Sequence, residues 1–221
     1  MLRLGRNFKT KVIAKRIKDK GILSKLLEQG IKILLIKECQ KIANIKIDIV
    51  SSSIQIIKGE IQKINLFAED INYKDLLFDA VELEANYLKV NFKLTTKELY
   101  FKNNPIIKLK ISLSQNSLET ILLSNNWNYI GNMISKKILN QDKLQAIKIK
   151  NGQFFIKASE DNITISNDEQ IEIQANKGKI FLKSRSYNKT FQIPIEEKIY
   201  IKNVIIENNI INVYANSSIS F

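Results

Sequence analysis

The chain has 221 residues, of which 44% are hydrophobic and 26% are charged, as in an ordinary folded globular protein. It contains no histidine and a single cysteine, Cys39. These facts exclude a Ser-His-Asp triad, a histidine general base, histidine-ligated metal and an intramolecular disulfide. We expect Cys39 to be a small apolar residue on a helix.

The net charge of +13 is concentrated near the N-terminus. Residues 1–41 carry 12 basic and 3 acidic side chains, a net of +9, which leaves +4 for the other 180 residues. Isoleucine, lysine and asparagine are overused throughout, so the overall charge says little about partners. The local excess says more, because a basic segment attracts an anionic lipid surface or nucleic acid.

Residues 1–20 are interpreted as a basic N-terminal arm, in which residues 8–20 have the spacing of a short amphipathic helix. The arm residues that we expect at a membrane surface are Arg3, Arg6, Phe8, Lys9, Lys11, Lys15 and Arg16. The alternative is a solubilising terminus. These residues do not resemble a secretory signal peptide, and no apolar run reaches the roughly 18 residues of a membrane span. We therefore expect a cytoplasmic protein, free or peripherally bound to a membrane.

Residues 22–42 have the spacing of an amphipathic helix. Its predicted core-facing residues, spaced at i, i+3 and i+4, are Leu23, Leu26, Leu27, Ile31, Leu34 and Leu35. The opposite face, expected in solvent, holds Lys25, Glu28, Gln29 and Lys32.

From residue 43 to 113 the apolar residues alternate with polar ones, which is typical of strands with one dry face. Residues 117–139 then predict a second helix, with Asn116 and Glu119 placed as a capping box. Alternation resumes and continues to the C-terminus.

The chain thus runs helix, strands, helix, strands. We predict a basic arm over residues 1–20 and a single α+β domain over residues 21–221. Similar text follows each helix, "ANIKI" at 43–47 and "QAIKI" at 145–149, which suggests a weak repeat of 21–115 in 116–221. Chance similarity in a chain so rich in isoleucine and lysine is the alternative.

Ten to twelve one-sided strands need a cover, yet only two helices are available. The predicted fold is α+β: a long curved antiparallel β-sheet wrapped around one or two long helices, forming a partial barrel with an apolar groove. The groove residues predicted from strand phase are Leu83, Tyr87, Ile107, Leu109, Ile111 and Leu122.

Six acidic residues of the segment 59–90 could instead mark a catalytic edge; they are Glu69, Asp70, Asp75, Asp79, Glu82 and Glu84. Glu82 and Glu84 alternate with apolar residues, so we expect them on the wet side of a strand. Glu69 and Asp70 are adjacent and point to opposite faces. Phosphate-binding, dinucleotide-binding and calcium-binding motifs are absent from the sequence. We expect no catalytic residue, no metal and no cofactor, and conclude that the protein is not an enzyme.

Three segments resemble the LmeA-like phospholipid-binding family, formerly a domain of unknown function. They are residues 59–90, "LYFKNNPIIKLKISLS" at 99–114, and "SLETILLSN" at 117–125. The resemblance covers about residues 20–140 and implies a fold like that of the tubular lipid-binding proteins, with a groove for acyl chains. The best-known relatives are exported, and this chain shows no export signal, so the resemblance does not extend to an envelope role.

The function that we expect is non-enzymatic binding or transfer of a phospholipid or another acyl-chain ligand at an anionic membrane surface. One alternative is a structural or assembly protein that docks a partner on its apolar sheet face, with Trp127, Tyr129 and Met133 as anchors. A less favoured alternative is nucleic-acid binding through the arm, whose only aromatic residue is Phe8.

Overall fold

The computed structural model describes residues 21–93, 98–160, 163–164 and 168–218. The elements are, in chain order, α2 (Ile22–Glu38), β1 (Lys41–Val50), α3 (Ser53–Ile57), β2 (Glu60–Tyr73), β3 (Leu76–Lys93), β4 (Glu98–Phe101), β5 (Ile106–Ser114), α4 (Gln115–Leu123), α5 (Asn128–Ile138), β6 (Lys143–Lys150), β7 (Gln153–Glu160), β8 (Ile163–Thr164), β9 (Glu169–Asn176), β10 (Lys179–Ser184), β11 (Thr190–Gln192), β12 (Ile199–Glu207) and β13 (Ile210–Ser218). The predicted arm, with its seven membrane-surface residues, lies outside the described residues.

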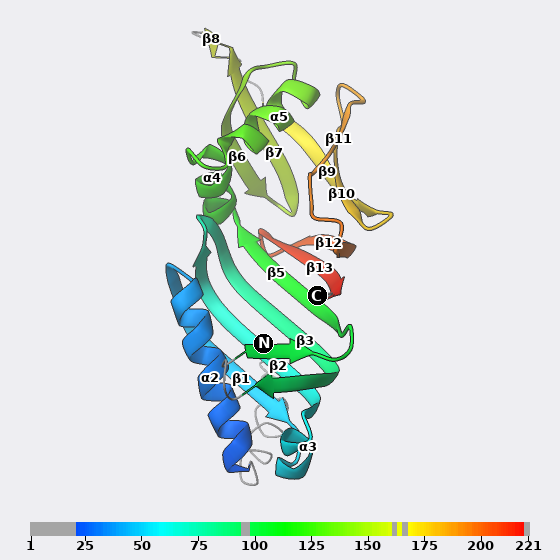
Figure 1. Ribbon diagram of the computed structural model, residues 1–221. Coiled ribbons are helices and arrows are strands. Elements are labelled where there is room, and N and C mark those ends of the chain that lie inside the picture. The colour runs from blue at the N-terminus through cyan, green and yellow to red at the C-terminus, as the bar shows by residue number, and fades with distance from the viewer. Residues whose placement is uncertain (1–20, 94–97, 161–162, 165–167, 219–221) are drawn as a thin grey trace, which may run out of the picture.

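The strands form two antiparallel sheets that are stacked end to end (Figure 1). The first has the order β1-β2-β3-β5-β13-β12, with β4 paired to β3. The second has the order β11-β10-β9-β7-β6, with β8 paired to β7. Over the described ranges the end strands of each order do not pair with one another, so each sheet stays open. The predicted α+β class with mainly antiparallel strands is confirmed.

The C-terminal hairpin joins the two sheets. After β11 completes the second sheet, β12 and β13 return to the first, where β13 pairs with β5. The backbone N–H of Ile201 on β12 also donates to the carbonyl of Gly178, in the turn between β9 and β10, at 3.0 Å. Apolar residues of the hairpin, including Ile201 and Val213, are buried in the same core as Ile147 and Ile156 of the second sheet. The hairpin therefore shares one core with the second sheet.

Hydrogen-bonded register gives the first sheet one apolar face. One row of paired residues crosses six strands and is apolar throughout: Ile47, Leu66, Leu83, Leu109, Ala215 and Ile201. The neighbouring row contains Ala68, Val81, Ile111, Val213 and Val204. Because side chains alternate along each strand, the residues between these rows point to the other face. We call the surface formed by the two rows, with Ile49, Ile64, Ala85 and Ile107, the apolar face.

Polar helix side chains protect an edge of each sheet. The Glu28 Oε1 atom on α2 accepts a hydrogen bond from the Ile49 N–H on β1 at 2.9 Å. The Gln115 Oε1 atom on α4 accepts one from the Ile149 N–H on β6, also at 2.9 Å. An uncovered strand edge would template pairing with another chain, so these acceptors both satisfy the backbone and block that pairing.

The side of α2 that faces the sheet differs from the prediction. Leu27 and Ile31 pack on the sheet as expected, but Leu26 and Leu34 are each 62% exposed, and Glu28 turns toward β1. The helix carries apolar residues on most of its circumference, so spacing alone does not define which side is buried. The buried side is instead defined by Glu28, which must face β1 to accept a hydrogen bond from its edge.

The second predicted helix is two helices. α4 ends at Leu123 and α5 begins at Asn128, because Ser124 bonds locally: its hydroxyl donates to the Ile121 carbonyl and accepts from the Trp127 N–H. The helix start is also earlier than predicted. Ser114, rather than Asn116, caps α4 by accepting from the Ser117 N–H at 3.3 Å.

Two glycine substitutions test this backbone. Gly59 has φ +74°, and a Cβ there would clash with the Val90 carbonyl oxygen, so Gly59→Ala is expected to destabilise the fold by about 2 kcal/mol or more. Gly30 lies within α2 with no atom near its added Cβ, so Gly30→Ala should stabilise by about 0.5–1 kcal/mol. Urea denaturation measures both, and equal effects of the two substitutions would contradict the described backbone.

Candidate functional site

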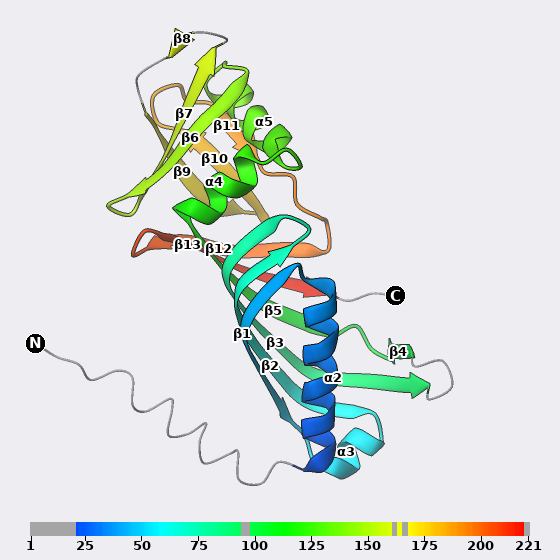
Figure 2. The same ribbon diagram turned by 90° about the vertical axis from the view of Figure 1, so that its left-hand side faces the viewer.

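The apolar face is covered at its two ends by different parts of the molecule. At one end α2 packs Leu27 and Ile31 onto a buried cluster made of Ile49, Ile61, Ala85 and Leu88. At the other end the hairpin β12–β13 faces the second sheet, together with α4 and α5 (Figure 2). The middle of the face lies where these two covers meet.

Four of the six predicted groove residues lie together in this middle region. Leu83 and Ile107 pack against the cluster under α2, whereas Leu109 and Ile111 pack against the other core. All four side chains are only half-buried. Neither cover fully removes them from water, so an apolar ligand could still bury surface here.

Tyr87 and Leu122 do not join that group. Tyr87 adopts a left-handed backbone with φ +54°, and its side chain is 79% exposed. This conformation breaks the strict alternation of β3, so that the next residue, Leu88, is buried instead of Tyr87. Leu122 lies on α4, half-buried against the core of the second sheet. An isolated left-handed residue within a strand leaves no clear signal in the sequence.

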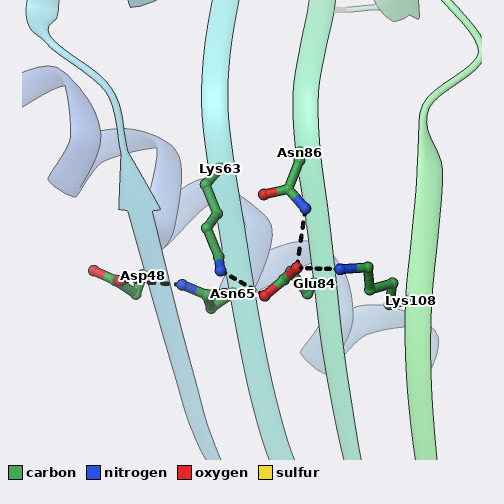
Figure 3. A network of polar contacts seen from close by, with 6 residues as sticks. All are labelled: Asp48, Lys63, Asn65, Glu84, Asn86 and Lys108. Atoms are coloured by element: carbon green, nitrogen blue, oxygen red, sulfur yellow. Dashed lines mark hydrogen bonds and ion pairs between the residues drawn. The ribbon is translucent and has the colours of Figure 1, made fainter. Parts of the chain in front are cut away.

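The opposite face of the first sheet carries a network of paired charges (Figure 3). The Glu84 carboxylate on β3 accepts from Lys63 on β2, from Lys108 on β5 at 3.0 Å, and from its neighbour Asn86 at 3.0 Å. Glu82 pairs in the same way with Lys110, at 2.8 Å. Cross-strand pairs of opposite charge stabilise a sheet, so these carboxylates fix the register that aligns the apolar face.

The hydrogen bonds from Lys63, Asn86 and Lys108 lower the pKa of Glu84 to about 2. A general acid at neutral pH needs a raised pKa, and a general base needs one near the working pH. Glu84 has neither property. Four more acids of this segment also bond within the chain: Glu69 to Asn44, Asp70 to Lys41, Asp75 to Asn126, and Asp79 to the Ser114 N–H. The geometry thus gives these carboxylates structural partners.

The predicted anchors on the second pair of helices are partly engaged. The Trp127 Nε1 atom donates to the Lys74 carbonyl, in the turn between β2 and β3, at 3.1 Å, and its ring stacks on Tyr129. Tyr129 and Met133 are 52% and 42% exposed. Trp127 therefore ties the turn to the helices rather than projecting freely.

A pocket of about 220 Å³ lies between β12 and the second sheet, beside Val204 of the apolar face. Its lining includes Phe154, Gln170, Ile171, Ile173, Arg185, Val204 and Ile206. This volume is below that of typical ligand sites, and the lining contains none of the six predicted groove residues. The apolar face remains the better candidate for a large apolar ligand.

The described part of the chain lacks both a metal-ligand cluster and a membrane-spanning helix. It contains no group of three or more cysteine or acidic side chains arranged as metal ligands. None of its helices combines the length and the hydropathy needed to cross a membrane.

Comparison with known proteins gave no match: no family model, no curated protein and no solved structure is similar to this chain. The resemblance to the LmeA-like family therefore stays a prediction from the residues.

The charge network predicts a pH-dependent contribution to stability. Because folding lowers the pKa of Glu84 from 4.5 to about 2, its stabilisation is present above pH 4.5 and is lost as the pH falls toward 2. The side chain is 33% exposed, so we expect Glu84→Gln to cost only about 1 kcal/mol at pH 7. The cost should shrink below pH 4.5, as measured by urea denaturation.

Glu82→Gln is the matched control, since Glu82 pairs with the lysine Lys110, whereas Glu84 accepts from two lysines and an asparagine. It should cost less than Glu84→Gln at pH 7. A loss in Glu84→Gln that is the same at pH 7 and pH 2.5, or a carboxyl titration midpoint above 4 by NMR, would contradict the network.

Proposed function

We propose that this protein binds a phospholipid or another acyl-chain lipid on the apolar face, at a membrane surface, without catalysing a reaction. One observation carries the proposal. Leu83, Ile107, Leu109 and Ile111 form a continuous apolar area in the middle of a sheet, and the two covers of that sheet leave them half-buried.

The energetics favour an acyl chain as the occupant. Burying a methylene group stabilises by about 0.8 kcal/mol, so a chain laid on this area gains affinity without any specific motif. From β2 to β13 the row of Leu66, Leu83, Leu109 and Ala215 spans three strand spacings, or about 14 Å. That length of uninterrupted apolar side chains suits a linear hydrocarbon.

In the finer architecture that we propose, the first sheet wraps around α2, and the bound chain lies between α2 and the second sheet. α2 would then serve as one wall, through Leu27 and Ile31. This arrangement is the one that the resemblance to the tubular lipid-binding proteins implies. Net positive charge would hold the protein near anionic lipid, at about 1 kcal/mol per basic residue close to the surface.

Docking of a protein partner is the second candidate. It is favoured by the exposure of Tyr129 and Met133 on α5, since aromatic residues and methionine are enriched at interfaces. Docking of a partner does not account for the half-buried area on the sheet, because α2 and the second sheet of this chain already lie over that area.

Lipid loading by a variant of Leu83 tests the proposal. The full chain is incubated with detergent micelles containing a labelled phospholipid, the detergent is removed, and bound label is counted. Leu83→Gln places an amide against the acyl chain and should weaken binding about tenfold. Leu83→Met keeps the volume and polarity and should load like the parent protein.

Thermal unfolding of each variant separates lost binding from lost folding. If Leu83→Gln unfolds, the nearly isosteric Val81→Thr replaces it, since Val81 lies in the neighbouring row. A folded Leu83→Gln or Val81→Thr protein that loads as much lipid as the parent would rule out binding on this face.

A further inference from the structure

The side of α2 that faces away from the sheet is mostly apolar. At 3.6 residues per turn, Ile22, Leu26, Ile33 and Ile36 fall within an arc of about 80°, opposite Ile31. One polar residue, Gln29, lies in the same arc. Each of the four apolar residues is more than half exposed, between 51% for Ile36 and 78% for Ile22. A helix that is apolar on both sides is normally covered on both. We call these four residues the outer face of α2.

α3 adds two exposed isoleucines next to α2. It lies beside the N-terminal end of α2 (Figure 2), where the side chain of Ser53 approaches Gly21. Its Ile54 and Ile57 are 67% and 75% exposed. Six large aliphatic residues are thus exposed on two neighbouring helices, and exposed apolar residues that gather on a surface mark interaction sites.

The charges around the outer face are basic. By helical position Lys25 lies on one side of the apolar arc and Lys37 on the other, and Lys58 directly follows α3. Glu28 turns away from this surface to bond β1. A helix with an apolar stripe flanked by lysines is typical of segments that lie in the plane of an anionic membrane interface.

The sequence contains a second membrane signal directly before α2. Residues 1–20 join α2 at its first turn and contain eight Lys and Arg against one acidic residue, Asp19. One weak signal binds a membrane only marginally, whereas an apolar surface together with a basic segment binds stably.

We propose that the outer face of α2, with Ile54 and Ile57 of α3, docks on an anionic bilayer with α2 lying in the interface. This inference rests on the proposed function and adds to it the surface that meets the membrane. It places the apolar face of the sheet about one helix diameter, roughly 10 Å, from the bilayer.

A second copy of the chain suits this surface less well. A two-fold symmetric contact would bring the outer faces together with their lysines. Like charges that face each other oppose association, whereas an anionic bilayer neutralises them.

Vesicle flotation of the full chain tests the docking surface. We expect binding to vesicles of phosphatidylcholine with 30% phosphatidylglycerol, and little binding to phosphatidylcholine alone or in 500 mM salt. Ile33→Gln combined with Ile57→Gln should weaken binding at least tenfold, because both side chains would insert into the interface. The matched control, Tyr129→Gln with Tyr187→Gln, removes two exposed aromatics of the other half of the molecule and should float normally.

A fluorescent label reports the contact directly. In a Cys39→Ser background, an environment-sensitive dye on Ile33→Cys should shift to the blue with anionic vesicles, and the same dye on Tyr187→Cys should not. Flotation without a shift at position 33, or flotation unaffected by the double isoleucine variant, would overturn the proposal. The proposal would also be overturned if the dye shifted to the blue without vesicles and light scattering gave twice the mass of the chain. That result would assign the surface to contact with a second copy.

Lipid loading from micelles separates this result from the proposed function. The double isoleucine variant keeps Leu83 and the apolar face, so it should load lipid normally while failing to float. If the parent protein floats with vesicles but loads no lipid from micelles, the docking surface stands and the lipid site on the apolar face is wrong.

Discussion

The register of the first sheet is the constraint on which the rest of the structure depends. Pairing across β1, β2, β3, β5, β13 and β12 places Leu83 beside Leu66 and Leu109. On the other side it places Glu84 opposite Lys108. A slip of one residue between two strands would move charges into the core and apolar residues into water. The ion pairs of Glu82 and Glu84 therefore matter less for their individual strength than for fixing which face is dry.

The apolar face is wider than the helices in the described part of the chain cover. The chain responds by covering one end with α2 and the other with the second sheet, to which the C-terminal hairpin is joined by a shared core. Each cover includes a helix whose polar side chain accepts a hydrogen bond from an edge strand: Glu28 of α2 from β1, and Gln115 of α4 from β6. The half-buried area between the two covers is the reason for proposing an apolar ligand, and the outer face of α2 is the reason for proposing a membrane.

Most strands could be predicted from sequence, because alternation such as Ile107, Leu109 and Ile111 reflects a physical requirement of one-sided burial. Four of the predicted groove residues accordingly lie on one face. Features set by long-range contacts could not be predicted. The side of α2 that packs on the sheet depends on the hydrogen bond that Glu28 accepts from the Ile49 N–H. The exposure of Tyr87 depends on its own left-handed backbone. The return of the hairpin to β5 depends on pairing between residues about 100 positions apart. The break at Ser124 follows from local serine hydrogen bonds that a continuous apolar stripe conceals.

The central claim is that the apolar face holds a lipid, and native mass spectrometry of the freshly purified full chain tests it most directly. The account predicts an added mass in the phospholipid range at close to one per chain, identified after extraction with organic solvent. A mass equal to that of the chain alone, unchanged after exposure to phospholipid micelles, would contradict it.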